Sequence, residues 1–247
     1  MPFSKYIPNF ITLLNLFSGL LALICAFNND FEMAFAFVCL GIFFDFWDGF
    51  FARILKVQSE VGLQLDSLAD MVTSGVVPGV VMYKMLYTIY DFSGADVSEH
   101  LLHYFLPYIG FIITLASCYR LAKFNVDTRQ TTSFIGLPTP ANALFILSLP
   151  LILDDSPNTS IVYNMLMNPY VLMGITALSA YMLNAEIPLF SLKIKQFNFK
   201  DNKLQIGFLV LALVLLIILK YLAIPLIIIA YVVLSVINNL FSQQPTE

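Results

Sequence analysis

Four aspartates lie close together in this sequence, within segments that are otherwise strongly apolar: Asp45, Asp48, Asp66 and Asp70. An ionised side chain at membrane depth is unfavourable by roughly 2.5–3.5 kcal/mol on insertion scales, so such residues usually have a function. Carboxylates gathered around one point repel each other unless a cation neutralises them. Oxygen ligands without His or Cys suit Mg²⁺, Mn²⁺ or Ca²⁺. The residue types therefore predict a divalent-metal site.

The spacing of these acids predicts that they share one pocket between two helices. Asp45 and Asp48 are three residues apart and fall on one helix face. Asp66 and Asp70 are four residues apart and form a stripe on a second helix. The link between the two helices, at about residues 55–61, is short, so we expect them to be antiparallel neighbours.

Small and basic residues accompany the acids on the same helix faces. Gly49, Ala52 and Gly62 leave room for a ligand to approach the backbone closely. Arg53 presents a fork of donors that fits phosphate. Together with the acids, these residues predict a metal site that receives a phosphate or a diphosphate.

The motif resembles the signature of the CDP-alcohol phosphatidyltransferase family. It reads Asp45-x-x-Asp48-Gly49-x-x-Ala52-Arg53, then eight residues, then Gly62-x-x-x-Asp66-x-x-x-Asp70. The resemblance implies a reaction at a diphosphate that uses two Mg²⁺ or Mn²⁺ ions.

The same resemblance implies roles for the individual residues of the motif. Asp45, Asp48 and Asp66 are expected to be metal ligands. Asp70 is expected to be the general base and also a metal ligand. Gly49, Ala52 and Gly62 would leave space for the nucleotide end of the substrate, and Arg53 would hold phosphate.

The first apolar segment carries polar residues along one side. Asn9, Thr12 and Asn15 follow each other at intervals of three. One interpretation is ordinary hydrogen bonding between membrane helices. The other is that they line the nucleotide pocket, because Pro-Asn-x-x-Thr-x-x-Asn-x-x-x-Gly is similar to the opening of the phosphatidylserine synthase branch of the family.

Two further runs resemble the same branch. Arg120-Leu121-Ala122-Lys123-Phe124-Asn125 is similar to a run in which a second Arg usually stands at the position of Lys123. Gly136-Leu137-Pro138-x-Pro140 matches a second hallmark, although Asn142 stands where the branch often has Ala. From the residues alone, the first run is a basic flank of a membrane segment and the second a rigid helix start. The resemblance makes Arg120, Lys123, Asn125, Pro138 and Pro140 candidates for binding the acceptor, L-serine.

The composition places these motifs in a membrane protein. The chain has 247 residues, of which 59% are hydrophobic and 11% charged, and its mean hydropathy is +0.83. Neither this composition nor the net charge of −4 implies nucleic-acid binding. Apolar runs long enough to cross a bilayer recur at about 9–28, 32–54, 67–90, 101–123, 134–153, 161–184, 204–220 and 221–241.

The predicted fold is an all-α polytopic membrane protein with about eight transmembrane helices. It forms one domain over residues 1–247, with a six-helix catalytic core at about 1–190 and an additional C-terminal pair at about 204–241. Cys25, Cys39 and Cys118 have neither metal nor disulfide spacing, and we expect them to be buried small residues. The N-terminal stretch lacks a cleavage pattern, so it is interpreted as retained.

The charges between the apolar runs predict the orientation of the chain. With the N-terminus cytoplasmic, the inside receives Lys5, Arg53, Lys56, Arg120, Lys123, Arg129, Lys193, Lys195, Lys200 and Lys203. The outside then holds Asp30, Glu32, Asp91, Asp96, Glu99, Asp154 and Asp155. We therefore expect both termini to be cytoplasmic and the acidic motif to lie at the cytoplasmic leaflet, in a membrane that the branch resemblance suggests is bacterial.

The resemblance implies transfer of a phosphatidyl group from CDP-diacylglycerol to L-serine, with release of CMP, by a homodimer. Within the family the acceptor alternatives are glycerol 3-phosphate, inositol phosphate or a second lipid. A cation or proton transporter is the alternative from another class, because it also buries carboxylates in the membrane. Transporters more often show acids near the midplane and repeated halves, and this sequence has neither.

Overall fold

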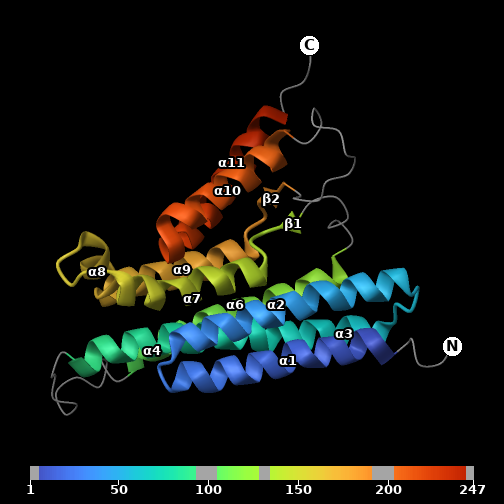
Figure 1. Cartoon of the computed structure of the whole chain (residues 1–247), viewed down its shortest axis with the longest axis horizontal. Helices are drawn as coiled ribbons and strands as arrows, with labels where there is room; N and C mark the ends of the chain where they lie inside the picture. The colour runs from blue at the N-terminus through green and yellow to red at the C-terminus, as the bar shows by residue number, and fades with distance from the viewer. Residues whose placement is uncertain (1–5, 93–104, 128–133, 191–202, 243–247) are drawn as a thin grey trace.

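The computed structural model describes residues 6–92, 105–127, 134–190 and 203–242, and they are overwhelmingly helical (Figure 1). In chain order the elements are α1 (Tyr6–Phe27), α2 (Phe31–Ile54), α3 (Glu60–Asp70), the π-helical η2 (Met71–Val76), α4 (Val77–Phe92), the 3-10 helix η3 (Leu106–Phe111), α6 (Ile112–Val126), β1 (Phe134–Ile135), α7 (Thr139–Asp155), α8 (Ile161–Leu166), α9 (Pro169–Asn184), β2 (Pro188–Leu189), α10 (Lys203–Leu219), the 3-10 helix η4 (Lys220–Leu222) and α11 (Ala223–Ser242). The all-α prediction is confirmed.

Five helical stretches among the described residues are long and apolar enough to cross a membrane. They are Tyr6–Phe27, Phe31–Ile54, Glu60–Ile89, Leu106–Val126 and Gln205–Leu240. The protein is therefore an integral membrane protein, as predicted. The number of crossings and the side on which each terminus lies remain predictions.

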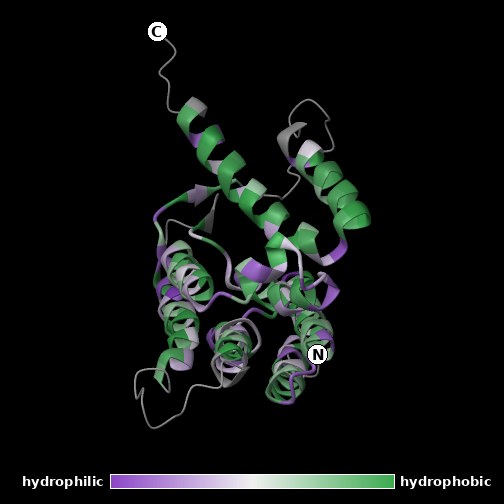
Figure 2. Cartoon of the chain, turned by 90° about the vertical axis from the view of Figure 1, so that its left-hand side faces the viewer, coloured by the Kyte–Doolittle hydropathy of each residue, from purple (hydrophilic) through white to green (hydrophobic). Residues whose placement is uncertain are grey.

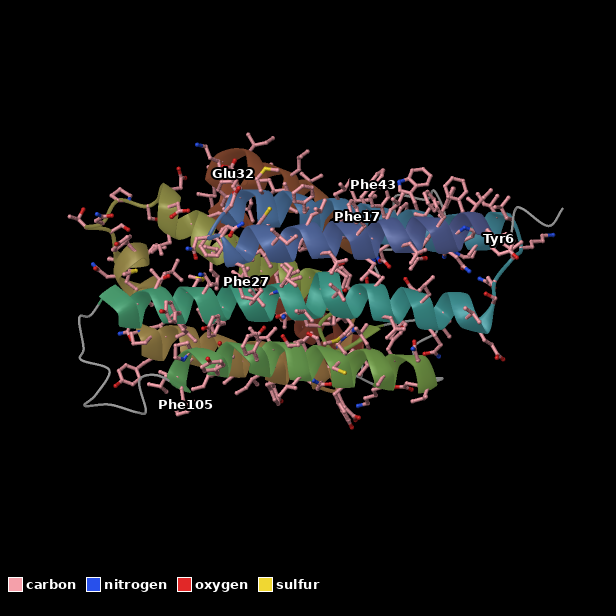
Figure 3. The ribbon with its side chains drawn as sticks, turned by 90° about the horizontal axis from the view of Figure 1, so that it is seen from below. Tyr6, Phe17, Phe27, Glu32, Phe43 and Phe105 are labelled. Carbon is pink, nitrogen blue, oxygen red and sulfur yellow. The ribbon has the colours of Figure 1, made fainter. Side chains whose placement is uncertain are left out.

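The first half of the chain forms one layer of side-by-side helices. The pair α1–α2 has the most extensive contact in the fold, and α3, η2 and α4 continue as one long rod beside α1 (Figure 1). Aromatic side chains cover the outside of this layer, and Phe43, which is 54% exposed, points away from the bundle (Figure 3). Exposed apolar side chains of this kind are the surface that a bilayer solvates.

The apolar core fills the half of the bundle away from the acidic motif. It contains Ala22 and Ala26 near the end of α1, Val38 early in α2, and Val81 and Met82 in α4, each at most 2% exposed. The other half holds the buried polar groups Thr12, Asn15 and Asp48. The bundle is thus divided along its length into an apolar half and a polar half.

The rod formed by α3 and α4 is interrupted by a π-helical segment directly after Asp70. Residues Met71–Val76 form η2, and Pro78 follows in the first turn of α4. Pro78 has no N–H for the carbonyl four residues earlier, so regular hydrogen bonding is lost at this point. Single-turn π segments inside helices frequently mark functional sites.

Two expected crossings differ from the structure. The run predicted at 161–184 is divided into α8 and α9, because Asn168 precedes a proline and caps the next helix by accepting from Tyr170 N at 2.9 Å. The run predicted at 134–153 begins as a helix only at Thr139. Phe134 and Ile135 instead pair antiparallel with Leu189 and Pro188.

Gly136 connects this short strand pair to α7. Its φ is +75°, and a Cβ there would lie 2.7 Å from the carbonyl oxygen of Leu183. Only glycine combines this left-handed backbone with such a close approach. The Gly-Leu-Pro run therefore forms a rigid helix entry, as predicted, with Pro138 as the N-cap residue and Pro140 in the first turn of α7.

The C-terminal helices α10 and α11 rise away from the bundle as a hairpin (Figure 1). Almost all of their residues are hydrophobic (Figure 2). Besides α10 and η4, α11 packs against α7 and β2, and Tyr231 donates to the carbonyl of Phe190 at 2.8 Å.

All three cysteines are free, but they are less buried than predicted. Cys25 and Cys39 are half-buried and Cys118 is exposed. A thiol is apolar enough to face lipid, so burial against protein is not required. Several charges used for the orientation lie outside the described residues: Lys5, Asp96, Glu99, Arg129, Lys193, Lys195 and Lys200.

Candidate active site

Three of the four aspartates converge at one end of the bundle. Carboxylate oxygens of Asp45 and Asp48 from α2 and of Asp66 from α3 lie within 4.8 Å of one another. Asp48 is 5% exposed, and Asp45 and Asp66 are half-buried. Asp70 does not belong to this triad. It lies one helical turn beyond Asp66, towards the apolar half.

The link between α2 and α3 brings the acids together. Lys56 adopts a left-handed φ of +54°, and Val57 N donates to Ala52 O at 3.0 Å, which ends α2. Ser59 then caps α3 by accepting from Gly62 N at 3.1 Å. Because α3 already begins at Glu60, the link is shorter than the sequence predicted. The expected direct packing of the two helices is not found, since both pack chiefly against α1.

The triad fits a divalent cation by its chemistry. Three carboxylates at this separation repel each other strongly, and in a largely buried setting water screens that repulsion poorly. Oδ1 of Asp66 is buried and accepts no hydrogen bond from the described residues. The donor set is entirely hard oxygen, which suits Mg²⁺ or Mn²⁺.

Side chains of α1 hold two of the aspartates. The hydroxyl of Thr12 donates to Oδ2 of Asp48 at 2.5 Å. The amide of Asn15 donates from Nδ2 to Oδ1 of Asp70 at 3.1 Å. Both α1 residues are at most 3% exposed. The sequence left open whether these polar residues form hydrogen bonds between helices or line a pocket. In the structure Thr12 and Asn15 form hydrogen bonds between helices, and their partners are the aspartates.

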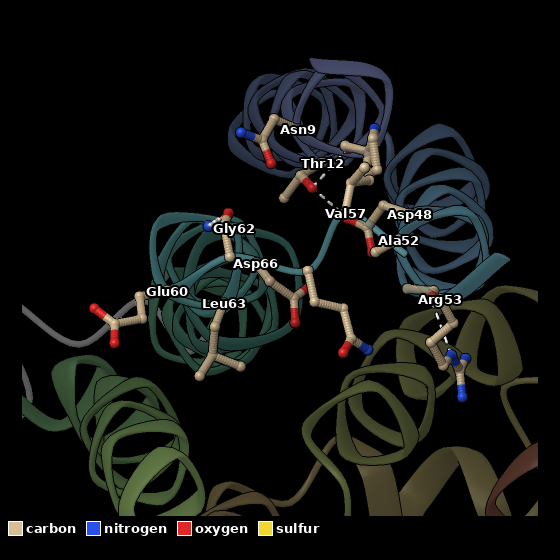
Figure 4. Close-up of a pocket in the computed structure, with 14 residues that line it drawn as sticks. Asn9, Thr12, Asp48, Ala52, Arg53, Val57, Glu60, Gly62, Leu63 and Asp66 are labelled. Atoms are coloured by element: carbon tan, nitrogen blue, oxygen red, sulfur yellow. Dashed lines mark hydrogen bonds between the residues drawn. The ribbon is translucent and has the colours of Figure 1, made fainter. Parts of the chain in front are cut away.

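A cavity of about 530 Å³ opens beside the triad (Figure 4). The predicted site residues that line it are Asn9, Thr12, Asp48, Gly49, Ala52, Arg53, Gly62 and Asp66. Asn15 is not among its lining residues, since it lies deeper along α1. The sequence analysis did not select Pro8, Val57, Gln58, Ser59, Glu60 and Leu63, which also line the cavity. Most of these residues belong to the link and the first turn of α3. They could have been predicted as lining residues because they lie between the two halves of the aspartate motif.

The small residues have different surroundings in this cavity. A Cβ on Gly49 would meet only the Arg53 guanidinium, at 3.8 Å, so the wall is open there. A Cβ on Gly62 would approach Ser59 Oγ at 3.2 Å and Asn9 Oδ1 at 3.3 Å. Arg53 is exposed and donates from Nε to Gly49 O at 2.8 Å, and it points away from Asp66 (Figure 4). Its remaining guanidinium donors are therefore available at the rim.

The candidate acceptor residues are not gathered in one place. Arg120 is 8% exposed, and its Nε has no hydrogen-bond partner in the described part of the chain. Lys123 forms an ion pair with Glu186 at 3.3 Å. Asn125 is tied to α3 through Ser67, with contacts of 3.0 and 3.1 Å. Pro138 and Pro140 shape the start of α7 and do not line the cavity beside the triad.

The sequence of this chain also matches known proteins. Residues 5–178 match the sequence model of a family described as CDP-alcohol phosphatidyltransferase. The matched region contains α1 to α8 and the first part of α9, and therefore all four aspartates. The hairpin of α10 and α11 lies outside it.

Several curated bacterial and archaeal proteins are similar to this chain, each named CDP-diacylglycerol--serine O-phosphatidyltransferase. The protein from Bacillus subtilis is 36% identical over 150 residues, which cover 59% of this chain and 75% of that protein. The protein from Helicobacter pylori strain J99 is 31% identical over 150 residues, covering 60% of this chain and 58% of that protein. The protein from Methanocaldococcus jannaschii is 33% identical over 141 residues, covering 57% and 58%.

Proposed function

This chain belongs to the CDP-alcohol phosphatidyltransferase family, and we propose that it transfers the phosphatidyl group of CDP-diacylglycerol to L-serine, giving phosphatidylserine and CMP. The observation that carries the proposal is the carboxylate triad beside a cavity of about 530 Å³ at one end of a membrane bundle. The names of the similar proteins support serine as the acceptor.

We propose Asp45, Asp48 and Asp66 as the residues that hold the divalent cations, two Mg²⁺ or Mn²⁺ ions, with Asp70 as an additional ligand. When bound, such ions would neutralise the diphosphate and stabilise the leaving CMP. Thr12 would keep Asp48 oriented through its hydrogen bond. Asn9, Gly49, Ala52 and Gly62 would border the nucleotide, and Arg53 would bind phosphate at the rim.

Asp70 would act as the general base. Its carboxylate would accept the proton of the serine hydroxyl while that oxygen forms a bond to the phosphorus of CDP-diacylglycerol. The bond from that phosphorus to the oxygen of CMP breaks, and CMP leaves as an anion. Asn15 donates a hydrogen bond to Oδ1 of Asp70, which supports Oδ2 as the atom that would accept the proton.

Arg120 is the favoured candidate for binding the carboxylate of serine. Its side chain is largely buried and has an unused donor, whereas Lys123 is already paired with Glu186 and Asn125 with Ser67. Asp70 balances part of the charge of Arg120, and the carboxylate of serine would satisfy its unused Nε donor. Glycerol 3-phosphate or inositol phosphate would bring more negative charge and call for further cations.

The proposal places the reaction at the cytoplasmic leaflet. Lys56 follows α2 at the triad end, and Asp30 precedes the same helix at the other end. A cysteine placed at Lys56 in a chain without its native cysteines should react with a membrane-impermeant maleimide in inverted vesicles only. The proposal also includes a homodimer, as the family resemblance implies, and cross-linking in native membranes tests it.

The decisive experiment is CMP release by purified protein with CDP-diacylglycerol and Mn²⁺ or Mg²⁺. Serine, glycerol 3-phosphate and inositol phosphate are supplied in separate reactions, beside an Asp70→Asn variant. Release with serine that is lost in the variant is the expected result. CMP release with another acceptor alone would rule out serine as the acceptor and keep the reaction type. If no acceptor gave metal-dependent CMP release, the proposed reaction itself would be wrong.

The role of Arg120 is tested by the dependence of the rate on serine concentration. Arg120→Lys should raise the KM for serine at least about tenfold and leave the KM for CDP-diacylglycerol within about threefold, since one bidentate contact is lost. Lys123→Gln serves as the comparison on the same helix. An unchanged KM for serine in the Arg120 variant would contradict the assignment.

A further inference from the structure

A second cavity lies at the end of the bundle opposite to the triad. It has a volume of about 390 Å³ and is lined by Phe27, Tyr83, Lys84, Tyr87 and Tyr108. Phe27 is the last residue of α1, and Tyr6, the first, marks the triad end of the same helix (Figure 3). About 20 Å of helix separates Lys84 from Asp70, so this site is distinct from the carboxylate site.

Among the described residues that line this cavity, Lys84 alone carries a charge. Its side chain is half-buried. Within the described part of the chain the one ion pair joins Lys123 to Glu186, at the other end of the bundle. A partly desolvated ammonium without a counter-charge is unfavourable, so a bound anion would stabilise this region.

The aromatic side chains form a packed wall around the lysine. The ring of Tyr83 is 5.2 Å from that of Tyr108 and stacks on Phe111 at 5.3 Å, which joins α4 to η3. Tyr87 continues the row at 6.0 Å from Tyr83. Rings fixed by each other in this way present a preformed surface, and tyrosines of this kind gather where hydrocarbon meets headgroups.

The position of the cavity indicates which anion reaches it. Lys84 lies inside the apolar stretch Glu60–Ile89, only five residues before its end. Phe27 and Tyr87 are 52% and 45% exposed, on a surface that faces lipid. A headgroup phosphate reaches this depth with its acyl chains in the bilayer, whereas a free anion would have to enter between lipids.

We propose that this cavity, between α1, α4 and η3, binds the phosphate of an anionic phospholipid in the leaflet opposite to the carboxylate site. Lys84 supplies the charge, and the tyrosines supply an amphipathic wall along which the lipid lies. The proposal does not depend on the reaction that the triad performs.

Lipid retention in purified protein tests the proposal. The wild type, Lys84→Gln and Lys84→Arg are reconstituted in discs with equal amounts of phosphatidylglycerol and phosphatidylcholine, moved into detergent and analysed by native mass spectrometry. Lys84→Gln is expected to retain about five- to tenfold less phosphatidylglycerol, since one cation near a membrane surface contributes an effect of that size. Lys84→Arg should retain it as the wild type does.

Lys220→Gln is the matched control. Lys220 is also a single lysine at this end of the bundle, but its cavity contains Asp155. This variant should keep the phosphatidylglycerol of the wild type. Circular dichroism and thermal unfolding of each variant establish that the fold is intact, and Tyr87→Leu, which removes part of the wall without a charge change, should also reduce retention.

Three results would overturn the proposal. One is equal retention of phosphatidylglycerol by Lys84→Gln and the wild type. Another is equal retention of phosphatidylcholine and phosphatidylglycerol by the wild type. The third is displacement of the lipid by millimolar inorganic phosphate, which would identify the site as one for free phosphate.

Discussion

The amide of Asn15 donates a hydrogen bond to Oδ1 of Asp70 across 3.1 Å, and 55 residues separate the two in the chain. The carbonyl of Asn15 in turn accepts from the hydroxyl of Thr73 at 3.2 Å. Asn15 thus connects α1 to the rod at the point where α3 becomes η2. This pair fixes the orientation of the one aspartate that stands apart from the triad.

Replacing Asn15 by alanine should lower kcat about tenfold to a hundredfold. A hydrogen bond to a charged group contributes about 1.5–3 kcal/mol, and here its loss leaves Asp70 misoriented. The KM for CDP-diacylglycerol should change less than threefold, because Asn15 does not line the nucleotide cavity. Steady-state kinetics in detergent check this. Asn142→Ala, which removes another buried amide that bonds Ser179 and no aspartate, should leave kcat within threefold.

Replacing Thr12 by valine should weaken metal activation. Valine has the shape of threonine but cannot donate to Asp48, and loss of such an orienting partner typically reduces metal affinity by about 10- to 100-fold. The measurement is the Mn²⁺ concentration for half-maximal CMP release. Thr12→Ser should restore it, since serine keeps the hydroxyl.

Thr176→Val provides the matched control for this change. Thr176 is also fully buried, and its hydroxyl donates to the carbonyl four residues earlier at 2.8 Å. It lies on α9, away from the triad. If both valine variants changed metal activation equally, the effect at Thr12 would be general to buried threonines and the orienting role would be wrong.

Single Asp→Asn changes in the triad should separate stability from function. In EDTA, the variants of Asp45, Asp48 and Asp66 should unfold at the same temperature as the wild type or a few degrees higher, since one of three repelling charges is gone. Each should lose CMP release. Excess Mn²⁺ should raise the unfolding temperature of the wild type and not that of the variants; at a hundred times Kd, binding contributes about 2.7 kcal/mol.

Asp154→Asn is the control for the charge change, because Asp154 is exposed at the end of α7. This variant should respond to Mn²⁺ as the wild type does. A Mn²⁺ response that survived in all three triad variants would show that the metal binds elsewhere.

Gly41→Ala should destabilise the protein by about 1–3 kcal/mol, which is the usual cost of overpacking. A Cβ at Gly41 would lie 2.7 Å from Thr73 Cγ2 and 2.9 Å from Asn15 Oδ1, so α2 would have to move away from α1 and η2. Thermal unfolding measures the loss. Gly174→Ala, where no atom lies within 4 Å of the new Cβ, should be neutral or slightly stabilising.

The sequence by itself determined the membrane class, the helix faces that carry the acids and the residue types of the candidate site. A spacing of three or four residues places Asp45 with Asp48 and Asp66 with Asp70 on single helix faces whatever the rest of the chain does. The short link limits how far the start of α3 can lie from the end of α2, but both helices pack chiefly against α1. These features depend on local geometry, which residue types and spacing specify.

The tertiary structure alone decided that three of the four aspartates form the triad and that the fourth, Asp70, binds Asn15 instead. Asp66 joins the triad and Asp70 turns to Asn15 because the rotation of α3 and η2 is set by packing, where Gly19 of α1 and Gly41 of α2 permit the close approach of Thr73. The same is true of β1 and β2, whose pairing joins residues 53 or more positions apart. Such contacts depend on how the elements fit together in space, and no local pattern encodes that fit.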